Sequence, residues 1–167
     1  NLYYPDLGDI LLKPNKELGE LTVLNPGIPQ TDSWPKPFLY RTELANPDPN
    51  PGSSESIERI KKAAEMQIPT PFGRHSVIKL KNLKSPTEFT DNIEETILFS
   101  TESYEKSINQ NTNYGTEDPR ITKIDNTYYI TYVAYDGDNA LVALATTKDF
   151  KTIKKHGIIS PQISLDE

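Results

Sequence analysis

The sequence predicts an all-β protein that carries one short helix. Three features of its 167 residues support this: short segments rich in β-branched and aromatic residues, 14 prolines that divide the chain into loops, and a loose internal repeat. The 35% hydrophobic and 25% charged content is typical of a globular protein. The length suits one domain with a sizeable core.

The first half of the chain contains predicted strands and one insertion. Proline, glycine or polar residues bound the strand segments, which cover residues 21–25, 37–43, 75–83 and 95–100. Residues 45–52 hold three prolines and therefore form a loop. Ile57, Ile60 and Ala64 share one face at helical spacing with charges opposite, which predicts an amphipathic helix over residues 56–66. We interpret residues 44–70 as an insertion that contains this helix.

The second half contains four predicted strands in direct succession. They cover residues 120–124, 127–135, 140–147 and 152–160, and the short segments between them have the polar chemistry of hairpin turns. Four consecutive antiparallel strands make one blade of a β-propeller. This half therefore predicts one blade, at about residues 115–160.

A weak internal repeat extends the same interpretation to the first half. The segment KPFLYRTE at residues 36–43 parallels NTYYITYVA at residues 126–134, so residues 21–100 are predicted to form another blade. Two blades cannot close a ring that typically needs about four to eight. The remaining blades are expected from a missing C-terminal part or from a second chain.

Composition excludes several classes of partner and site. The net charge is −6 and no long basic cluster occurs, which argues against nucleic acid. No apolar run approaches the ~20 residues of a membrane helix. Cysteine is absent and only two histidines occur, so thiolate and histidine-rich metal centres are excluded and no metal site is predicted. We expect a cytoplasmic protein, with removal of a signal peptide before Asn1 as the alternative.

The segment EDPR, at Glu117 to Arg120, stands directly before a predicted strand. Pro119 biases Asp118 toward an extended conformation that would aim its carboxylate in one direction. Glu117 would raise the pKa of Asp118 and Arg120 would lower it. A carboxyl group at a pocket mouth is the type that protonates the leaving oxygen in glycoside cleavage. The alternative is a surface turn in which Asp118 caps an amide and Glu117 pairs with Arg120.

Longer motifs around this tetrapeptide carry a resemblance to a known family. Residues 115–132 (GTEDPRITKIDNTYYITY), 135–137 (YDG) and 144–150 (LATTKDF) together resemble glycoside hydrolase family 130, which contains β-mannoside phosphorylases and related β-mannosidases. Upstream, residues 25–27 (NPG) and 39–41 (LYR) are similar to motifs of the family's first blade. The resemblance begins at about residue 21 and is strongest over residues 115–159.

The resemblance implies a five-bladed propeller, of which this chain, residues 1–167, is the N-terminal part of a single catalytic domain. It implies cleavage of β-mannosidic bonds with inversion, by phosphate or water, without metal or organic cofactor. Asp118 matches the catalytic acid, whose proton would pass through a hydroxyl of the bound mannose. Asn25 and Arg41 match sugar-binding positions, with a turn and a cross-strand ion pair as their respective alternatives.

Three further residues are predicted near the site. Arg120 is expected to hold Asp118 in place. Tyr135 and Asp136 lie at a strand end where a funnel rim would be, although Asp136-Gly137 is also an ordinary hairpin signal. We favour the turn for Asp136.

The expected phosphate-binding strand departs from the family pattern. Residues 140–146 hold no basic residue, and Leu141 is near the place where phosphorolytic members carry arginine. Two alternatives to this enzyme stay open: a non-catalytic carbohydrate-binding propeller, and a furanosidase of the five-bladed type that would release arabinose or fructose.

Overall fold

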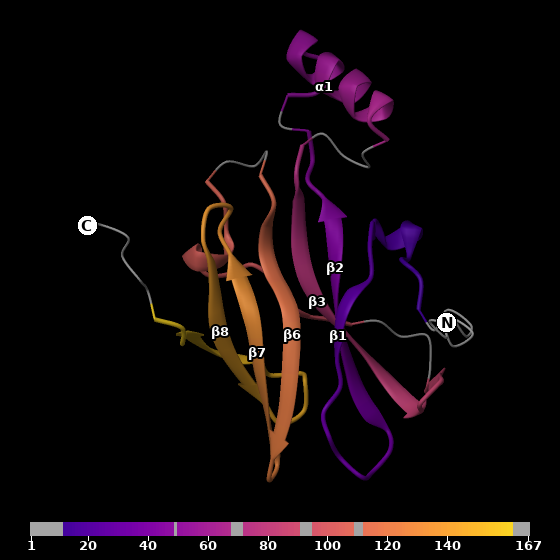
Figure 1. Ribbon diagram of the computed structural model, residues 1–167, viewed down its shortest axis with the longest axis vertical. Coiled ribbons are helices and arrows are strands. Elements are labelled where there is room, and N and C mark those ends of the chain that lie inside the picture. Colours follow the sequence, from indigo (N-terminus) through magenta and orange to yellow (C-terminus); the bar gives the residue numbers. More distant parts are fainter. Residues whose placement is uncertain (1–11, 49, 68–71, 91–94, 109–111, 162–167) are drawn as a thin grey trace, which may run out of the picture.

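The computed structural model describes residues 12–48, 50–67, 72–90, 95–108 and 112–161, whose strands form one open, mostly antiparallel sheet (Figure 1). Neighbouring strands follow the order β1-β2-β3-β6-β7-β8-β9, and β4 and β5 also pair with β3. The strands are β1 (Leu24–Gly27), β2 (Lys36–Ala45), β3 (Arg74–Ser85), β4 (Glu88–Phe89), β5 (Glu95–Leu98), β6 (Tyr114–Ile124), β7 (Thr127–Tyr135), β8 (Ala140–Thr147) and β9 (Lys154–Ile158). The helices are η1 (Lys16–Leu18), α1 (Ser54–Glu65) and η2 (Ser103–Glu105). The predicted β-rich fold with one α-helix is confirmed.

The predicted strands are present, with some boundaries shifted. β7 and β8 occupy the predicted residues 127–135 and 140–147, because their alternating pattern is bounded by clear turns. β6 begins at Tyr114 rather than at residue 120, so EDPR lies inside the strand and not before it. The pairing of β6 with β7 shifts register between Glu117 and Arg120, which identifies a β-bulge there.

A short parallel contact between β3 and β6 joins the two halves. His75 is opposite Tyr114 and Ser76 is opposite Gly115. Gly115 has φ +135°, and a Cβ added there would collide with the backbone of Ser76, so glycine permits this approach. The described strands therefore form one open sheet, and the closed ring of separate blades stays a prediction.

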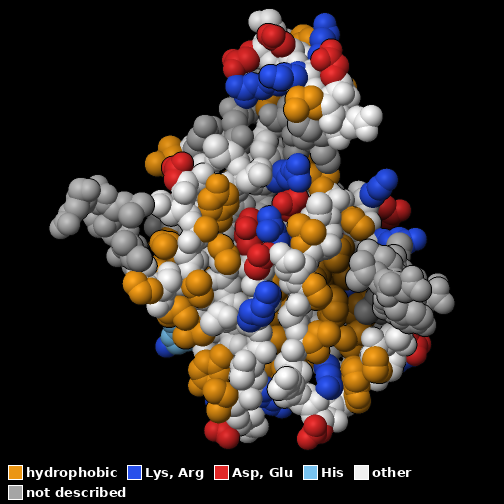
Figure 2. Space-filling model, viewed as in Figure 1, with side chains coloured by type: hydrophobic (Ala, Val, Ile, Leu, Met, Phe, Trp, Pro, Cys, Tyr) orange, Lys and Arg blue, Asp and Glu red, His pale blue; other side chains and the backbone are white. Residues whose placement is uncertain are grey.

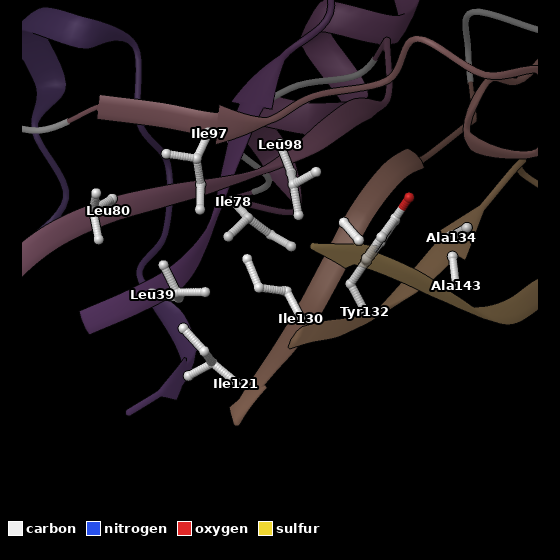
Figure 3. Close-up of a cluster of buried hydrophobic side chains, with 11 residues drawn as sticks. Leu39, Ile78, Leu80, Ile97, Leu98, Ile121, Ile130, Tyr132, Ala134 and Ala143 are labelled. Atoms are coloured by element: carbon white, nitrogen blue, oxygen red, sulfur yellow. The ribbon is translucent and has the colours of Figure 1, made fainter. Parts of the chain in front are cut away.

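The main hydrophobic core lies between faces contributed by both halves (Figure 3). Its buried members from the first half come from β2, β3 and β5, and those from the second half come from β6, β7 and β8. They are Leu39, Ile78, Leu80, Ile97, Leu98, Ile121, Ile130, Tyr132, Ala134, Ala143 and Ala145. Burying each large apolar side chain contributes about 1.5–3 kcal/mol, so this core fixes how the halves meet.

Helix α1 lies beyond one end of the sheet, between β2 and β3 (Figure 1). Ser53 caps its first turn by accepting from the amide of Ser56. The apolar face of the predicted amphipathic helix is not buried: Ile57 and Ile60 are 46% and 50% exposed, whereas Ser56 and Ala63 are the buried residues. The buried residues of the helix are therefore small ones. No described helix is long and apolar enough to cross a membrane.

A buried carboxylate anchors the segment that leads into β6. Glu105 is fully buried and accepts from the Tyr132 hydroxyl at 2.7 Å and from Lys155 Nζ at 2.6 and 2.8 Å. It also accepts from the amides of Thr101 and Glu102. Burial and the hydrogen bond to Glu105 raise the pKa of Tyr132 above its ordinary value. These bonds fasten residues 101–105 to β7 and β9.

Candidate functional site

Acidic and basic side chains gather near the middle of one face of the molecule, where β2, β3 and β6 run side by side (Figure 2). Four elements contribute, and their side chains are linked by short hydrogen bonds and ion pairs. We call this set the Asp118 cluster; its members are Asn25, Arg41, Glu43, Arg74, Ser76, Glu117 and Asp118.

Two similar bulges aim Asn25 and Asp118 at each other. Each precedes a proline, each has positive φ (+44° for Asn25, +48° for Asp118), and each lies where its strand shifts register against its neighbour. Asn and Asp tolerate this left-handed region better than other non-glycine residues. The predicted extended conformation of Asp118 is therefore wrong, because the bulge overrides the preference imposed by Pro119.

The carboxylate of Asp118 receives two donors on one oxygen. Asn25 Nδ2 lies 2.6 Å from Oδ1 and Arg41 Nη1 lies 3.3 Å from the same atom. The side chain is 34% exposed. Both of these hydrogen bonds go to Oδ1, and within the described residues Oδ2 accepts none.

Arg41 forms ion pairs with all three carboxylates of the cluster. Its Nη2 lies 2.9 Å from Glu43 Oε1 and 3.0 Å from Glu117 Oε1, while Nη1 reaches Asp118. Its Nε is buried and has no acceptor among the described residues. The expected alternative for Arg41, an ion pair, is thus present, and it also brings the guanidinium against the predicted acid.

Glu117 supplies the second carboxylate of EDPR, which pairs with Arg41. Ser76 Oγ donates to Oε1 at 2.9 Å, and the side chain is 13% exposed. Burial raises the pKa of Glu117, and Arg41 and Ser76 oppose that rise without cancelling it. Asp118 and Glu43 raise it further. Glu117 pairs with Arg41 here, so the surface pair with Arg120 is not formed.

A close approach of β1 to the second bulge keeps the site together. Gly27 packs against the backbone that follows Asp118, and a Cβ added to Gly27 would lie 2.7 Å from the Pro119 carbonyl oxygen. Pro119 is fully buried. Glycine at position 27 therefore lets the strand that carries Asn25 reach Asp118.

The structure does not bring the other predicted residues into this cluster. Arg120 is exposed and donates to the Pro119 carbonyl at 3.0 Å rather than to Asp118. Tyr135 donates to the Gly137 carbonyl at 2.9 Å. Asp136 Oδ1 accepts from the amides of the next turn residues, and these backbone hydrogen bonds lower the pKa of Asp136 despite partial desolvation. These are turn geometries, as favoured for Asp136.

Three members of the cluster were not predicted from the sequence to belong to the site: Glu43, Arg74 and Ser76. The available signal was alternation, since Arg41 and Glu43 lie two residues apart on one strand and therefore share a face. Arg74 and Ser76 share a face of β3 in the same way, and Ser76 is opposite Glu43. The residues of β2 and those of β3 come together only because these two strands pair.

The cluster combines donors and acceptors suited to hydroxyl groups. A guanidinium fork, a two-sided amide and carboxylates can each hold a vicinal diol. No group of three or more possible metal-binding side chains occurs in the described part of the chain. Two open cavities of about 390 and 480 Å³ lie elsewhere, one lined by His75, Phe99 and Tyr114 and the other by Ile108 and Asp136. The candidate site is therefore the cluster of charged groups and not either of these cavities.

Comparison with known proteins points to carbohydrate-active relatives. The family model for glycoside hydrolase family 130, described as β-1,4-mannooligosaccharide phosphorylase, matches residues 72–167, more than half of the chain. The matched segment contains Glu117 and Asp118, whereas Asn25 and Arg41 precede it. The β-1,2-mannobiose phosphorylase of Thermoanaerobacter sp. (strain X514) is 39% identical over 56 residues, which are 32% of this chain and 18% of that protein.

Two solved structures share the fold. The β-1,2-mannobiose phosphorylase from Listeria innocua, in complex with β-1,2-mannobiose, aligns with a TM-score of 0.57 and 22% identity over 89% of this chain and 47% of its own. A member of the mannoside phosphorylase family described among glycoside hydrolases that target β-1,2-mannosidic linkages in Candida mannan aligns with a TM-score of 0.59 and 18% identity, over 92% of this chain and 40% of its own. This chain therefore spans less than half the length of each relative named here.

Proposed function

We infer, from the premise that this chain belongs to glycoside hydrolase family 130, that the full-length protein is an enzyme that cleaves β-mannosidic bonds in oligosaccharides. One observation carries the proposal: Asp118 is fixed on a bulge with Oδ1 held by Asn25 and Arg41, while its side chain stays partly exposed. That is the arrangement expected of a group that must be both oriented and accessible to a sugar.

In this proposal Asp118 is the general acid of an inverting reaction. It delivers a proton toward the departing glycosidic oxygen, by way of a hydroxyl of the bound mannose, while a nucleophile attacks from the opposite face. Asn25 and Arg41 orient the carboxyl group and bind neighbouring hydroxyls. Glu117 supports the guanidinium of Arg41 through its ion pair with Nη2.

The rest of the site is proposed to come from outside this chain. We infer that the open sheet is the N-terminal part of a five-bladed β-propeller, with the first blade at about residues 21–100 and the second at about residues 115–160. The relatives extend well beyond the length of this chain, which supports a site whose other walls lie in later blades. The nucleophile would bind there.

The nucleophile is inorganic phosphate or water, and the relatives include both phosphorylases and hydrolases. Leu141 lies on β8 opposite Ala134, and β8 carries no basic residue. Within this chain, therefore, nothing on that strand favours phosphate.

Product analysis tests the proposal. The full-length protein is incubated with β-1,2- and β-1,4-mannobiose, with and without inorganic phosphate, and the products are followed by ¹H NMR. We expect mannose, or α-mannose 1-phosphate when phosphate is the nucleophile, with the inverted anomer formed first. Release of arabinose or fructose from furanosides instead, or no cleavage of any mannoside, would contradict the proposal.

A further inference from the structure

We propose that Glu43 is a positioning residue, which fixes the Arg41 guanidinium so that its Nη1 faces Asp118. The functional part of this inference rests on the proposed cleavage of β-mannosides, whereas its geometric part can be tested without activity. Glu43 carries no role in the sequence interpretation, and it contacts Asp118 only through Arg41.

Each oxygen of Glu43 is used by a different arginine. Oε1 accepts from Arg41 Nη2 at 2.9 Å, and Oε2 accepts from Arg74 Nη1 at 2.7 Å. The Glu43 side chain is only 8% exposed. Two charge-assisted bonds hold the carboxylate from both sides, so it presents Oε1 to Arg41 at a fixed place.

The arginine that it holds has a fixed orientation as a result. Glu43 and Glu117 both bind Nη2, one from β2 and the other from β6. Because the guanidinium is planar and rigid, fixing Nη2 between two carboxylates also fixes the direction of Nη1. That direction leads to Asp118 Oδ1 at 3.3 Å.

The charges alternate along this row: Arg74, Glu43, Arg41, Asp118. Arg41 and Glu43 lie on β2, Arg74 on β3, and Glu117, Asp118 and Arg120 on β6. Glu43 therefore lies between two cations, and removing its charge removes the partner that holds Arg41 Nη2 from the β2 side.

Kinetics of two variants test the functional part. In the full-length protein, Glu43→Gln should lower kcat/KM by about ten- to a hundredfold, through misorientation of Asp118. Glu55→Gln, which removes an exposed carboxylate that pairs with Arg59, should leave kcat/KM unchanged. A loss in Glu43→Gln no larger than the loss in Glu55→Gln would overturn the proposal.

The geometric part is tested by ¹⁵N NMR of arginine side chains, which needs no substrate. In the wild-type protein, Arg41 should show separate Nη signals because rotation about its Nε–Cζ and Cζ–Nη bonds is restricted, and Glu43→Gln should merge them. Glu55→Gln is the matched control, since it removes an exposed carboxylate that pairs with Arg59 at 2.6 Å. Unchanged Arg41 signals in Glu43→Gln would refute the positioning role even if no mannoside were cleaved.

Discussion

Arg41 and Glu117 depend on each other in the Asp118 cluster. The guanidinium favours the ionised form of Glu117, and burial of that side chain disfavours it; burial is the larger effect, so the pKa of Glu117 is raised. A buried ion pair of this kind gains little net stability, because desolvation offsets its attraction. Its value lies in the orientation that it gives Arg41.

The raised pKa of Glu117 predicts a pH-dependent contribution to stability. A carboxyl group with a raised folded pKa stabilises the protein fully below its unfolded pKa of 4.5 and loses that contribution as pH rises through the folded pKa. Glu117→Gln does not titrate, so its free energy of unfolding should improve relative to wild type between pH 4 and neutral pH. Urea unfolding at several pH values measures this difference. Glu55→Gln, which is exposed, should show no such trend, and a parallel pH dependence for Glu117→Gln and wild type would contradict the assignment.

At the residue scale the sequence predicted that Asn25, Arg41 and Asp118 lie together, but it did not predict their conformation. Asn25 and Arg41 are 93 and 77 residues from Asp118, yet motif matching placed all three in one site. The cation beside Asp118 is Arg41 rather than its neighbour Arg120, because the bulge turns the Asp118 side chain toward β2. A β-bulge of this kind depends on tertiary pairing and leaves no reliable local signal in the sequence.

The two proline-containing bulges form one structural unit in which β1 crosses close to β6. Asn25 and Asp118 occupy equivalent places in it, before Pro26 and Pro119, and both have positive φ. Bulges next to functional groups commonly redirect a side chain out of the regular alternation. Here the pair brings an amide and a carboxylate to within 2.6 Å of each other.

Gly27→Ala should separate the two bulges. The added Cβ would lie 2.7 Å from the Pro119 carbonyl oxygen, so β1 must shift, at an expected cost of about 1–3 kcal/mol in the free energy of unfolding. Denaturant unfolding measures that cost, and a crystal structure of the variant should show a longer Asn25–Asp118 distance. Gly52→Ala is the comparison: its Cβ meets no heavy atom within 4 Å, and it carries only the strain of φ +84°. An effect of Gly27→Ala no larger than that of Gly52→Ala would contradict the close approach.

Elements were predictable where alternation and turns agreed. β7 and β8 match their expected residues, since each strand has one buried and one partly exposed face. The burial of helix α1 was not predictable from its apolar spacing. Ile57 and Ile60 would face a core only if one lay beside them, and helix α1 lies beyond the end of the described sheet (Figure 1).

The site lies at the junction of the two halves of the molecule. Asn25 and Arg41 come from the first half and Glu117 and Asp118 from the second, so the charged groups meet only where the two halves join. The shared core and the pairing of β3 with β6 hold that junction. Tyr129 and Val142 lie on the face of β7 and β8 that points away from the hydrophobic core, and they remain 37% and 39% exposed. In the proposed propeller, that face would pack on the next blade.

The central claim is that Asp118 donates a proton to a departing sugar, and the dependence on leaving group tests it most directly. Wild type, Asp118→Asn and the control Asp125→Asn, which alters an exposed turn residue, are compared in the full-length protein on β-mannobiose and on a nitrophenyl β-mannoside, with phosphate present. A nitrophenolate leaves without protonation. We predict that Asp118→Asn loses about 10²- to 10⁴-fold in kcat/KM on mannobiose and less than about tenfold on the nitrophenyl substrate. An equal loss on both substrates would contradict the account.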